Sequence, residues 1–224
     1  MAWSELIWWQ VMLACIASYM VGNISVARFV AKSQHQDVTK LGSGNPGSTN
    51  ILRNFGFKLG VLNLALDMLK GVIPTLVFYL VFRHSVIVLY MCGLSVMLGH
   101  IYPVIFKFKG GKGIATMLGV FMVANPLVTL AVILIAALAW LCFEYGSVAS
   151  FLCVTCMTVI EGLKAKALPN PDSRIVCLLL FFIFLFTWYA HRSNIERLLF
   201  GKENRVSLIK KAKKSLNMPV DIKK

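Results

Sequence analysis

Long apolar segments follow one another along this chain, and they constrain its fold more than any other feature. Six segments are mainly apolar, and they cover residues 6–30, 61–82, 85–106, 114–143, 147–163 and 175–190. A helix needs about 20 such residues to span the hydrocarbon core of a bilayer. Because 58% of all residues are hydrophobic and only 14% are charged, the chain leaves no room for a separate soluble domain. The sequence therefore predicts an all-α integral membrane protein.

The apolar segment 114–143 is too long for one crossing. As a single helix it would extend about 45 Å, whereas the hydrocarbon core is about 30 Å thick. Asn125-Pro126 lies near its middle, and the residue before a proline is biased away from helical backbone. We therefore expect a break there and about seven transmembrane helices in all.

The distribution of charge predicts which side each end occupies. From residue 191 onward the chain has ten Lys or Arg against three acidic residues, whereas no Lys or Arg precedes Arg28. The positive-inside bias places such a C-terminus in the cytoplasm and the N-terminus outside, which requires an odd number of crossings. This topology places Lys164, Lys166 and Arg174 outside, which goes against the same positive-inside bias. Three polar segments, near residues 43, 110 and 191, would face the cytoplasm together.

The formal charge of +14 does not indicate a nucleic-acid partner, because the basic residues lie between and after the apolar segments. That pattern favours contact with anionic lipid headgroups. We expect a membrane domain over 1–206 and a basic cytoplasmic tail over 207–224, in which four lysines at 210, 211, 213 and 214 contact lipid.

The first polar segment, residues 41–53, is rich in glycine, asparagine and hydroxyl side chains, and it ends in an arginine. Such a composition makes tight loops that present hydrogen-bond donors. A short helix capped by Thr49 or Asn50 would carry the arginine. An ordinary interhelical turn is the simpler interpretation, but the density of donors favours a binding site. The candidate residues are Ser43, Gly44, Asn45, Gly47, Thr49, Asn50 and Arg53.

The second polar segment has the sequence Lys-Gly-Gly-Lys-Gly over residues 109–113. Glycine backbone turns sharply and lets N–H groups converge on an anion, and a helix starting near Ile114 would add its N-terminal dipole. The candidates are Gly110, Gly111, Lys112 and Gly113. A Walker A loop is excluded, because Lys112 is followed by Gly113 rather than by Ser or Thr. A basic turn that meets lipid headgroups remains an equal alternative.

Few ionisable residues fall inside the apolar segments. Asp67 and Lys70 are three residues apart and so share one helical face, which favours an internal ion pair over direct substrate contact. His100 is either a ligand or base, or a structural donor, and we favour structure. The six cysteines lie in or beside apolar segments and predict buried free thiols, and we expect no metal site.

Together, these segments resemble the bacterial acyl-phosphate-dependent glycerol-3-phosphate acyltransferases, the PlsY family. Residues 42–50 with Arg53 resemble the family's first motif, and Gly99-His100 through Gly113 resemble the second. The segment from His191 through Asn194 to Glu203 resembles the third. The likeness extends to about residue 206 and includes the Asp67–Lys70 step, although Ser48, Tyr102 and Glu196 depart from the usual residues.

The resemblance implies an enzyme of the bacterial inner membrane that uses no cofactor. It would move a fatty acyl group from acyl phosphate to the sn-1 hydroxyl of glycerol 3-phosphate. The resemblance also implies roles: His191, Asn194 and Lys112 would be catalytic, the residues of the first two segments would bind phosphate, and Glu203 would be structural. Whether His191 is a base or a positioning group stays open.

Two other functions remain possible from the residues alone. One is an anion or phosphate-ester transporter, although inverted repeats typical of transporters are not evident between the halves of the chain. The other is a different lipid-headgroup transferase with the same phosphate site.

Overall fold

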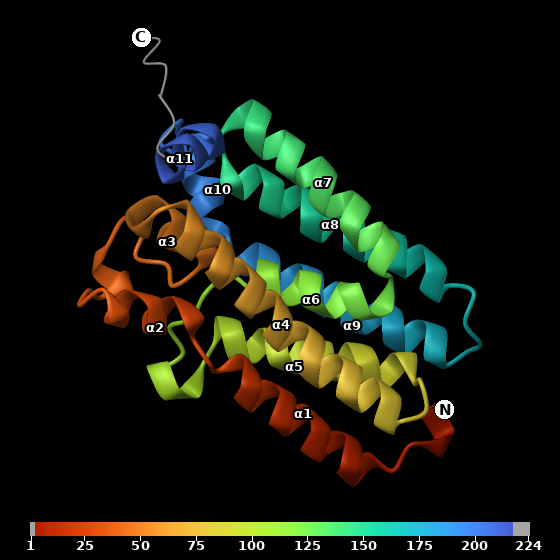
Figure 1. Cartoon of the computed structure of the whole chain (residues 1–224). Coiled ribbons are helices and arrows are strands. Elements are labelled where there is room, and N and C mark those ends of the chain that lie inside the picture. Colours follow the sequence, from red (N-terminus) through yellow and green to blue (C-terminus); the bar gives the residue numbers. More distant parts are fainter. Residues whose placement is uncertain (1–2, 217–224) are drawn as a thin grey trace.

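The computed structural model describes residues 3–216, and its regular structure over that range is helical (Figure 1). The α-helices are α1 (Trp8–Gly22), α2 (Val26–Ser33), α3 (Ser48–Phe55), α4 (Phe57–Val81), α5 (Val86–Ile101), α6 (Ile114–Ala124), α7 (Pro126–Phe143), α8 (Gly146–Ala165), α9 (Asp172–Ala190), α10 (Arg192–Leu199) and α11 (Leu208–Ser215). Three short 3₁₀ helices are η1 (Trp3–Glu5), η2 (Val38–Lys40) and η3 (Val104–Phe106).

The prediction of an all-α membrane protein is confirmed. Among the described residues, six helical segments are long and apolar enough to cross a bilayer, with α1 and α2 counted as one segment. The break at Asn125-Pro126 is also confirmed, because α6 ends at Ala124 and α7 begins at Pro126. With 11 residues, α6 extends only about 16 Å, so seven full crossings stay a prediction.

The first apolar segment is not the continuous helix that its composition suggests. It breaks between α1 and α2, where polar groups replace the regular helical bonding. The Asn23 side chain donates to the Tyr19 carbonyl at 2.7 Å, and the Ile24 carbonyl accepts a hydrogen bond from Lys70 at 2.8 Å. The break therefore tethers the start of α2 to α4.

The centre of the bundle is α5, whose membrane segment is 67% buried, whereas that of α7 is 17% buried and faces outward. The large core side chains include Tyr90 and Met97 of α5, and Phe121 of α6 packs against Tyr90. Helices α4 and α6 approach closely, because a Cβ added at Gly71 would overlap the Thr116 carbonyl. Small residues at helix crossings are the usual means of such packing in membranes.

The three polar segments meet at one end of the bundle (Figure 1). A small separate core of Val30, Val38 and Ile51 holds α2, η2 and α3 together there. Helix α3 begins at Ser48 after Gly47, so the predicted cap at Thr49 or Asn50 is wrong. The start of the described chain lies at the opposite end from α10 and α11. We call the end with the polar segments the motif end.

Two further expectations can be placed on the structure. The basic tail forms α11 over 208–215, which carries the four lysines, whereas residues 217–224 lie outside the described residues. All six cysteines are free thiols as predicted, but only Cys92 and Cys153 are buried, whereas Cys142 is exposed and the other three are partly exposed.

Candidate active site

A cavity of about 220 Å³ lies at the motif end, and we call it the inner cavity. Its wall is polar at one part and apolar at another. The polar wall includes Ser43, Asn45, Gly47, Thr49, Asn50, Arg53, Asp67, His100, Lys112, Gly113, His191, Asn194, Arg197 and Glu203. The apolar wall comes mainly from α6, α7 and α8 and includes Leu118, Ile133, Ala136, Trp140 and Cys153. One part of the cavity therefore suits a charged group, and the adjoining part suits an apolar chain.

The glycine loop before α6 is shaped by contact with His100. A Cβ at Gly111 would overlap the His100 ring, and one at Gly110 would overlap the His100 carbonyl. Gly113 has a φ of +85°, a left-handed conformation that favours glycine, and α6 begins directly after it. The first N–H groups of α6 are thus placed beside the inner cavity. His100 supports this loop, in keeping with its predicted structural role.

Lys112 connects the second and third polar segments. Its ammonium donates a hydrogen bond to the Asn194 side-chain oxygen, although the two residues are 82 positions apart. Burial, and then the neighbouring charge of Arg197, lowers the pKa of Lys112 to about 8 against the opposing effect of Glu203. Lys112 is thus a cation at neutral pH that is poorly compensated by its surroundings.

Glu203 holds the third segment together. Its carboxylate accepts hydrogen bonds from Asn194 at 2.8 Å, from Arg197 at 3.0 Å and from Ser147 at 3.2 Å. Asn194 is therefore fixed from both sides, with its oxygen on Lys112 and its nitrogen on Glu203. The structural role of Glu203 stays a prediction, and these contacts are the ones through which it would act.

His191 is buried at the junction of α9 and α10, with 2% of its surface exposed. Its Nδ1 lies 2.8 Å from the Thr187 carbonyl. Because a carbonyl only accepts, Nδ1 carries the hydrogen and Nε2 is left as an acceptor. Burial, and then the charge of Lys112, lowers the pKa of His191 to about 4. The imidazole is neutral at physiological pH.

In the first segment, the structure separates two kinds of side chain. The polar atoms of Asn50 are engaged within the loop, since its nitrogen donates to the Leu41 carbonyl at 2.9 Å and its oxygen accepts from the Ser43 N–H at 3.2 Å. Arg53, in contrast, has a buried Nε without a hydrogen-bond partner. Asn50 thus supports the loop, and Arg53 has a donor free for a ligand.

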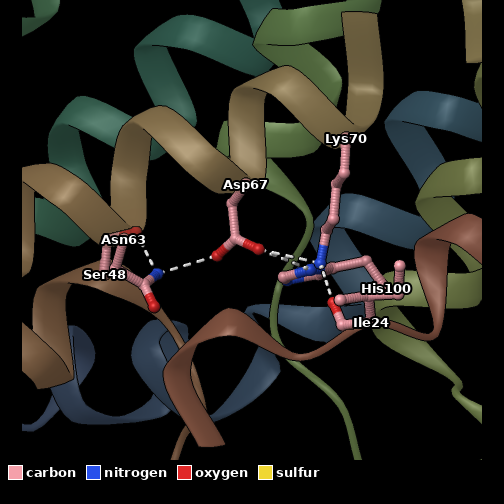
Figure 2. Close-up of polar contacts among 6 residues, drawn as sticks. All are labelled: Ile24, Ser48, Asn63, Asp67, Lys70 and His100. Carbon is pink, nitrogen blue, oxygen red and sulfur yellow. Dashed lines mark hydrogen bonds and ion pairs between the residues drawn. The ribbon is translucent and has the colours of Figure 1, made fainter. Parts of the chain in front are cut away.

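The charged pair predicted inside α4 is present (Figure 2), and its Asp67 also lines the inner cavity. Asp67 lies 2.8 Å from Lys70, and its other oxygen accepts from Asn63 at 2.8 Å. Asn63 also donates to Ser48 at the start of α3. The His100 ring lies 3.7 Å from Asp67. The pair therefore links α4 to the first and second polar segments.

Not every predicted residue lines the inner cavity. Gly44, Gly110 and Gly111 line a second cavity outside it, and Lys70 lines neither. Sequence reasoning did not select Arg197, Ser147 or Trp140 as site residues, although all three line the inner cavity. Of these three, only Arg197 could have been selected from the sequence, because it lies three residues after Asn194 and so shares a helical face with it. Within the described part of the chain, no cluster of metal-binding side chains is present.

A family model described as glycerol-3-phosphate acyltransferase matches residues 12–201. A glycerol-3-phosphate acyltransferase of Aquifex aeolicus (strain VF5) is 40% identical over 190 residues, which cover 85% of this chain and 96% of the relative. One of Burkholderia pseudomallei (strain K96243) is 36% identical over 210 residues, which cover 90% and 98%.

Two solved structures have the same fold. One is described as PlsY (YgiH), an integral membrane glycerol 3-phosphate acyltransferase, in its glycerol 3-phosphate form. It matches with a TM-score of 0.80 and 38% identity, over 89% of this chain and 97% of that one. The lysophosphatidic acid form matches with a TM-score of 0.78 and 37% identity, over the same shares of the two chains. The chain belongs to the glycerol-3-phosphate acyltransferase family of PlsY.

Proposed function

We propose that this protein transfers a fatty acyl group from acyl phosphate to the sn-1 hydroxyl of glycerol 3-phosphate. The products would be lysophosphatidate and inorganic phosphate. The observation that carries the proposal is the inner cavity, whose cationic wall adjoins an apolar wall. Acyl phosphate has the same two parts. The solved relatives, described in glycerol 3-phosphate and lysophosphatidic acid forms, support the acceptor and the product.

The cationic wall is suited to hold phosphoryl oxygens. Arg53 and Lys112 supply charge, and Ser43 and Asn45 supply neutral polar groups beside them. Charge-assisted hydrogen bonds of this kind are the strong ones, and they gain further where water is excluded. As the bond from the acyl carbon to phosphate breaks, negative charge grows on the phosphate oxygens, and the cations stabilise it.

His191 and Asn194 would orient the acceptor. In the proposed step the sn-1 oxygen attacks the acyl carbon, the bond from that carbon to the phosphate oxygen breaks, and the hydroxyl proton leaves. The Nε2 of neutral His191 is available to accept a hydrogen bond from that hydroxyl. With a pKa of about 4 the imidazole is a weak base. We therefore assign the proton to an oxygen of the departing phosphate and a positioning role to His191.

Direct transfer needs no covalent enzyme intermediate, because acyl phosphate is already an activated mixed anhydride. Two hydroxyls on the cavity wall are engaged elsewhere: Ser147 donates to Glu203, and Ser150 donates to the Gly146 carbonyl. Neither hydroxyl bond is to an imidazole, so the geometry favours positioning and charge stabilisation over a nucleophile with a paired base.

We further propose that the protein resides in a bacterial inner membrane with the motif end in the cytoplasm. The water-soluble acceptor would reach the inner cavity from that side. The lysines of α11 lie at the same end, where anionic headgroups would contact them. A cysteine placed at Ser207 should then react with impermeant reagents only from the cytoplasmic side.

The deciding experiment is a donor comparison with purified protein. Acyl phosphate and glycerol 3-phosphate should give lysophosphatidate and one phosphate per acyl group transferred, whereas acyl-CoA of the same chain length should not replace acyl phosphate. Transfer from acyl-CoA at an equal rate would overturn the donor assignment. Movement of glycerol 3-phosphate across a proteoliposome without an acylated product would indicate a transporter.

A further inference from the structure

A second cavity of about 880 Å³ lies on the other side of the glycine loop, and we call it the outer basin. Six basic side chains line it, from α2, the loop before α6, and α10. They are Arg28, Lys107, Lys109, Lys112, Arg192 and Arg197. Among the described residues on its wall, none is Asp or Glu. The six side chains carry a formal charge of +6, and only Arg197 forms an ion pair with a carboxylate among the described residues, that of Glu203 at 3.0 Å.

The inner cavity differs in this respect. There Asp67 and Glu203 lie on the same wall as Arg53, Lys112 and Arg197, so the inner cavity holds acidic groups that the basin lacks, although Asp67 is already paired with Lys70. In the basin the like charges repel one another, and an anion from solution has to balance them. Excess charge of one sign on a concave surface raises the local concentration of the opposite ion. The ligand expected in the basin is a small anion with more than one negative charge.

Two cations of the basin, Arg28 and Arg192, are held by contacts that leave their charge uncompensated. Arg28 donates to the Lys109 carbonyl at 2.8 Å and lies 4.4 Å from the centre of the Phe106 ring. Its Nε is buried without a hydrogen-bond partner. Arg192 donates to the Tyr189 carbonyl at 3.2 Å and lies 4.6 Å from the Tyr189 ring. Both guanidinium groups are thus positioned by a carbonyl and a ring, not by a carboxylate.

The two cavities share one wall. Ser43, Asn45, Lys112 and Arg197 line both of them. Three of these four, Ser43, Asn45 and Lys112, belong to the phosphate site proposed above, and Arg197 contacts it through Glu203 and Asn194. An anion held in the basin is therefore separated from the inner cavity mainly by side chains to which the proposed function assigns phosphate binding.

We propose that the outer basin is a second phosphate site. A small water-soluble phosphate monoester binds there before it enters the inner cavity, and inorganic phosphate binds there on its way out. This inference rests on the proposed function, for which the monoester is glycerol 3-phosphate. A phospholipid headgroup offers the same chemistry, and exposed Val104, Ile105 and Phe108 bring the adjoining loop to the lipid surface. The shared wall with the inner cavity favours the soluble phosphate.

The kinetic test uses the double variant Lys109→Gln/Arg192→Gln, which removes two charges that line only the basin. Lys58→Gln is the matched control, because Lys58 is an exposed lysine on α4 that lines neither cavity. We expect the KM for glycerol 3-phosphate to rise about five- to tenfold in the double variant, with the effect on KM rather than on kcat. The dependence of kcat/KM on salt should become flatter, because fewer charges attract the substrate. Equal KM and salt dependence in all three proteins would overturn the proposal.

A binding measurement separates this proposal from the assigned reaction. Titration calorimetry with inorganic phosphate should give two sites per chain for the wild type and one for the double variant, whether or not lysophosphatidate is formed. One site in both proteins would refute the basin and leave the acyl transfer intact. The kinetic comparison is repeated in nanodiscs of phosphatidylcholine alone and with phosphatidylglycerol added. A defect that appears only with the anionic lipid would assign the basin to headgroups and overturn our choice of ligand.

Discussion

Each end of the bundle buries one carboxylate cluster within a membrane helix, and the two clusters differ in what they adjoin. At the motif end, Asp67 pairs with Lys70 and lines the inner cavity. Glu161 lies 15 residues after Gly146 on α8, which places it about 22 Å along that helix. It accepts hydrogen bonds from Tyr90 at 2.8 Å and from Asn125 at 2.9 Å, and it lines neither cavity.

The partners of the two carboxylates explain what each cluster does. Lys70 has 6% of its side chain exposed, so Asp67 balances a charge that has no access to water. The ammonium nearest Glu161 is Lys164, whose side chain is 54% exposed and has water as an alternative partner. Asn125 precedes Pro126 at the break between α6 and α7, so Glu161 fixes a bend. Changes at the motif end should therefore alter catalysis, and changes at Glu161 should alter stability.

The largest effect is expected at Lys112, which lines both cavities. Lys112→Ala removes a buried cation beside the proposed phosphate, and kcat/KM should fall about 100- to 1000-fold. Lys213→Ala in α11 is the control and should stay within about twofold of the wild type. Initial rates of lysophosphatidate formation measure both. Equally small effects would mean that the glycine loop is a turn at the lipid surface.

Next in size is the loss of the α4 ion pair. Asp67→Asn leaves Lys70 buried without its counter-charge, which costs about 3–5 kcal/mol in typical proteins. We expect lower thermal stability in detergent together with reduced acyl transfer, because Asp67 also bonds Asn63 near the first segment. Asp67→Asn/Lys70→Met removes both charges and should recover most of the stability. A double variant as unstable as the single one would contradict the ion-pair explanation.

The pH dependence should also arise at the motif end. Lys112 is charged below its pKa of about 8 and loses its proton above it, so activity should decline as the pH rises through 8. By pH 9 roughly one tenth of Lys112 would be charged. Lys112→Arg stays charged and should lack this alkaline decline, whereas His191→Gln should keep it, because His191 is already neutral there. Rate profiles between pH 6 and 9.5 test all three proteins.

The smallest catalytic effect is predicted for Glu161→Gln. The variant keeps an acceptor for Tyr90 but loses its negative charge, and the net cost of weakening such a bond is about 1–2 kcal/mol. The melting temperature should fall while the KM and kcat stay within about twofold of the wild type. Should the acyl-transfer rate fall as far as in the Asp67→Asn variant, the proposed division between the two ends would be wrong.

Much of this arrangement is readable from the sequence where spacing along a helix determines contact. Asp67 and Lys70 are three residues apart, and the break at Asn125 is dictated by the following proline. The meeting of the polar segments also follows from the order of the apolar ones. What spacing cannot provide is the partner of a residue on another helix, such as Asn194 for Lys112, because that depends on packing between helices.

Two features escaped the sequence for different physical reasons. At the break between α1 and α2, the Ile24 carbonyl accepts a hydrogen bond from Lys70 on α4, and the local sequence gives no sign of that distant partner. Asn50 looked like a ligand residue because its type suits one, yet its polar atoms are used within its own loop. Residue type identifies what a side chain is able to bind, and only the fold decides what remains free.

The last part of the chain has a consequence for the order in which this protein is made. Glu203 and Asn204 line the inner cavity, and the buried Val206 accepts a hydrogen bond from Trp140 at 3.0 Å and donates one to the Glu144 carbonyl at 2.8 Å. A chain still being synthesised thus has its membrane helices before it has a complete wall to the cavity. We therefore expect the proposed acyl transfer to begin only after residues 203–206 have left the ribosome, because the inner cavity is incomplete before then.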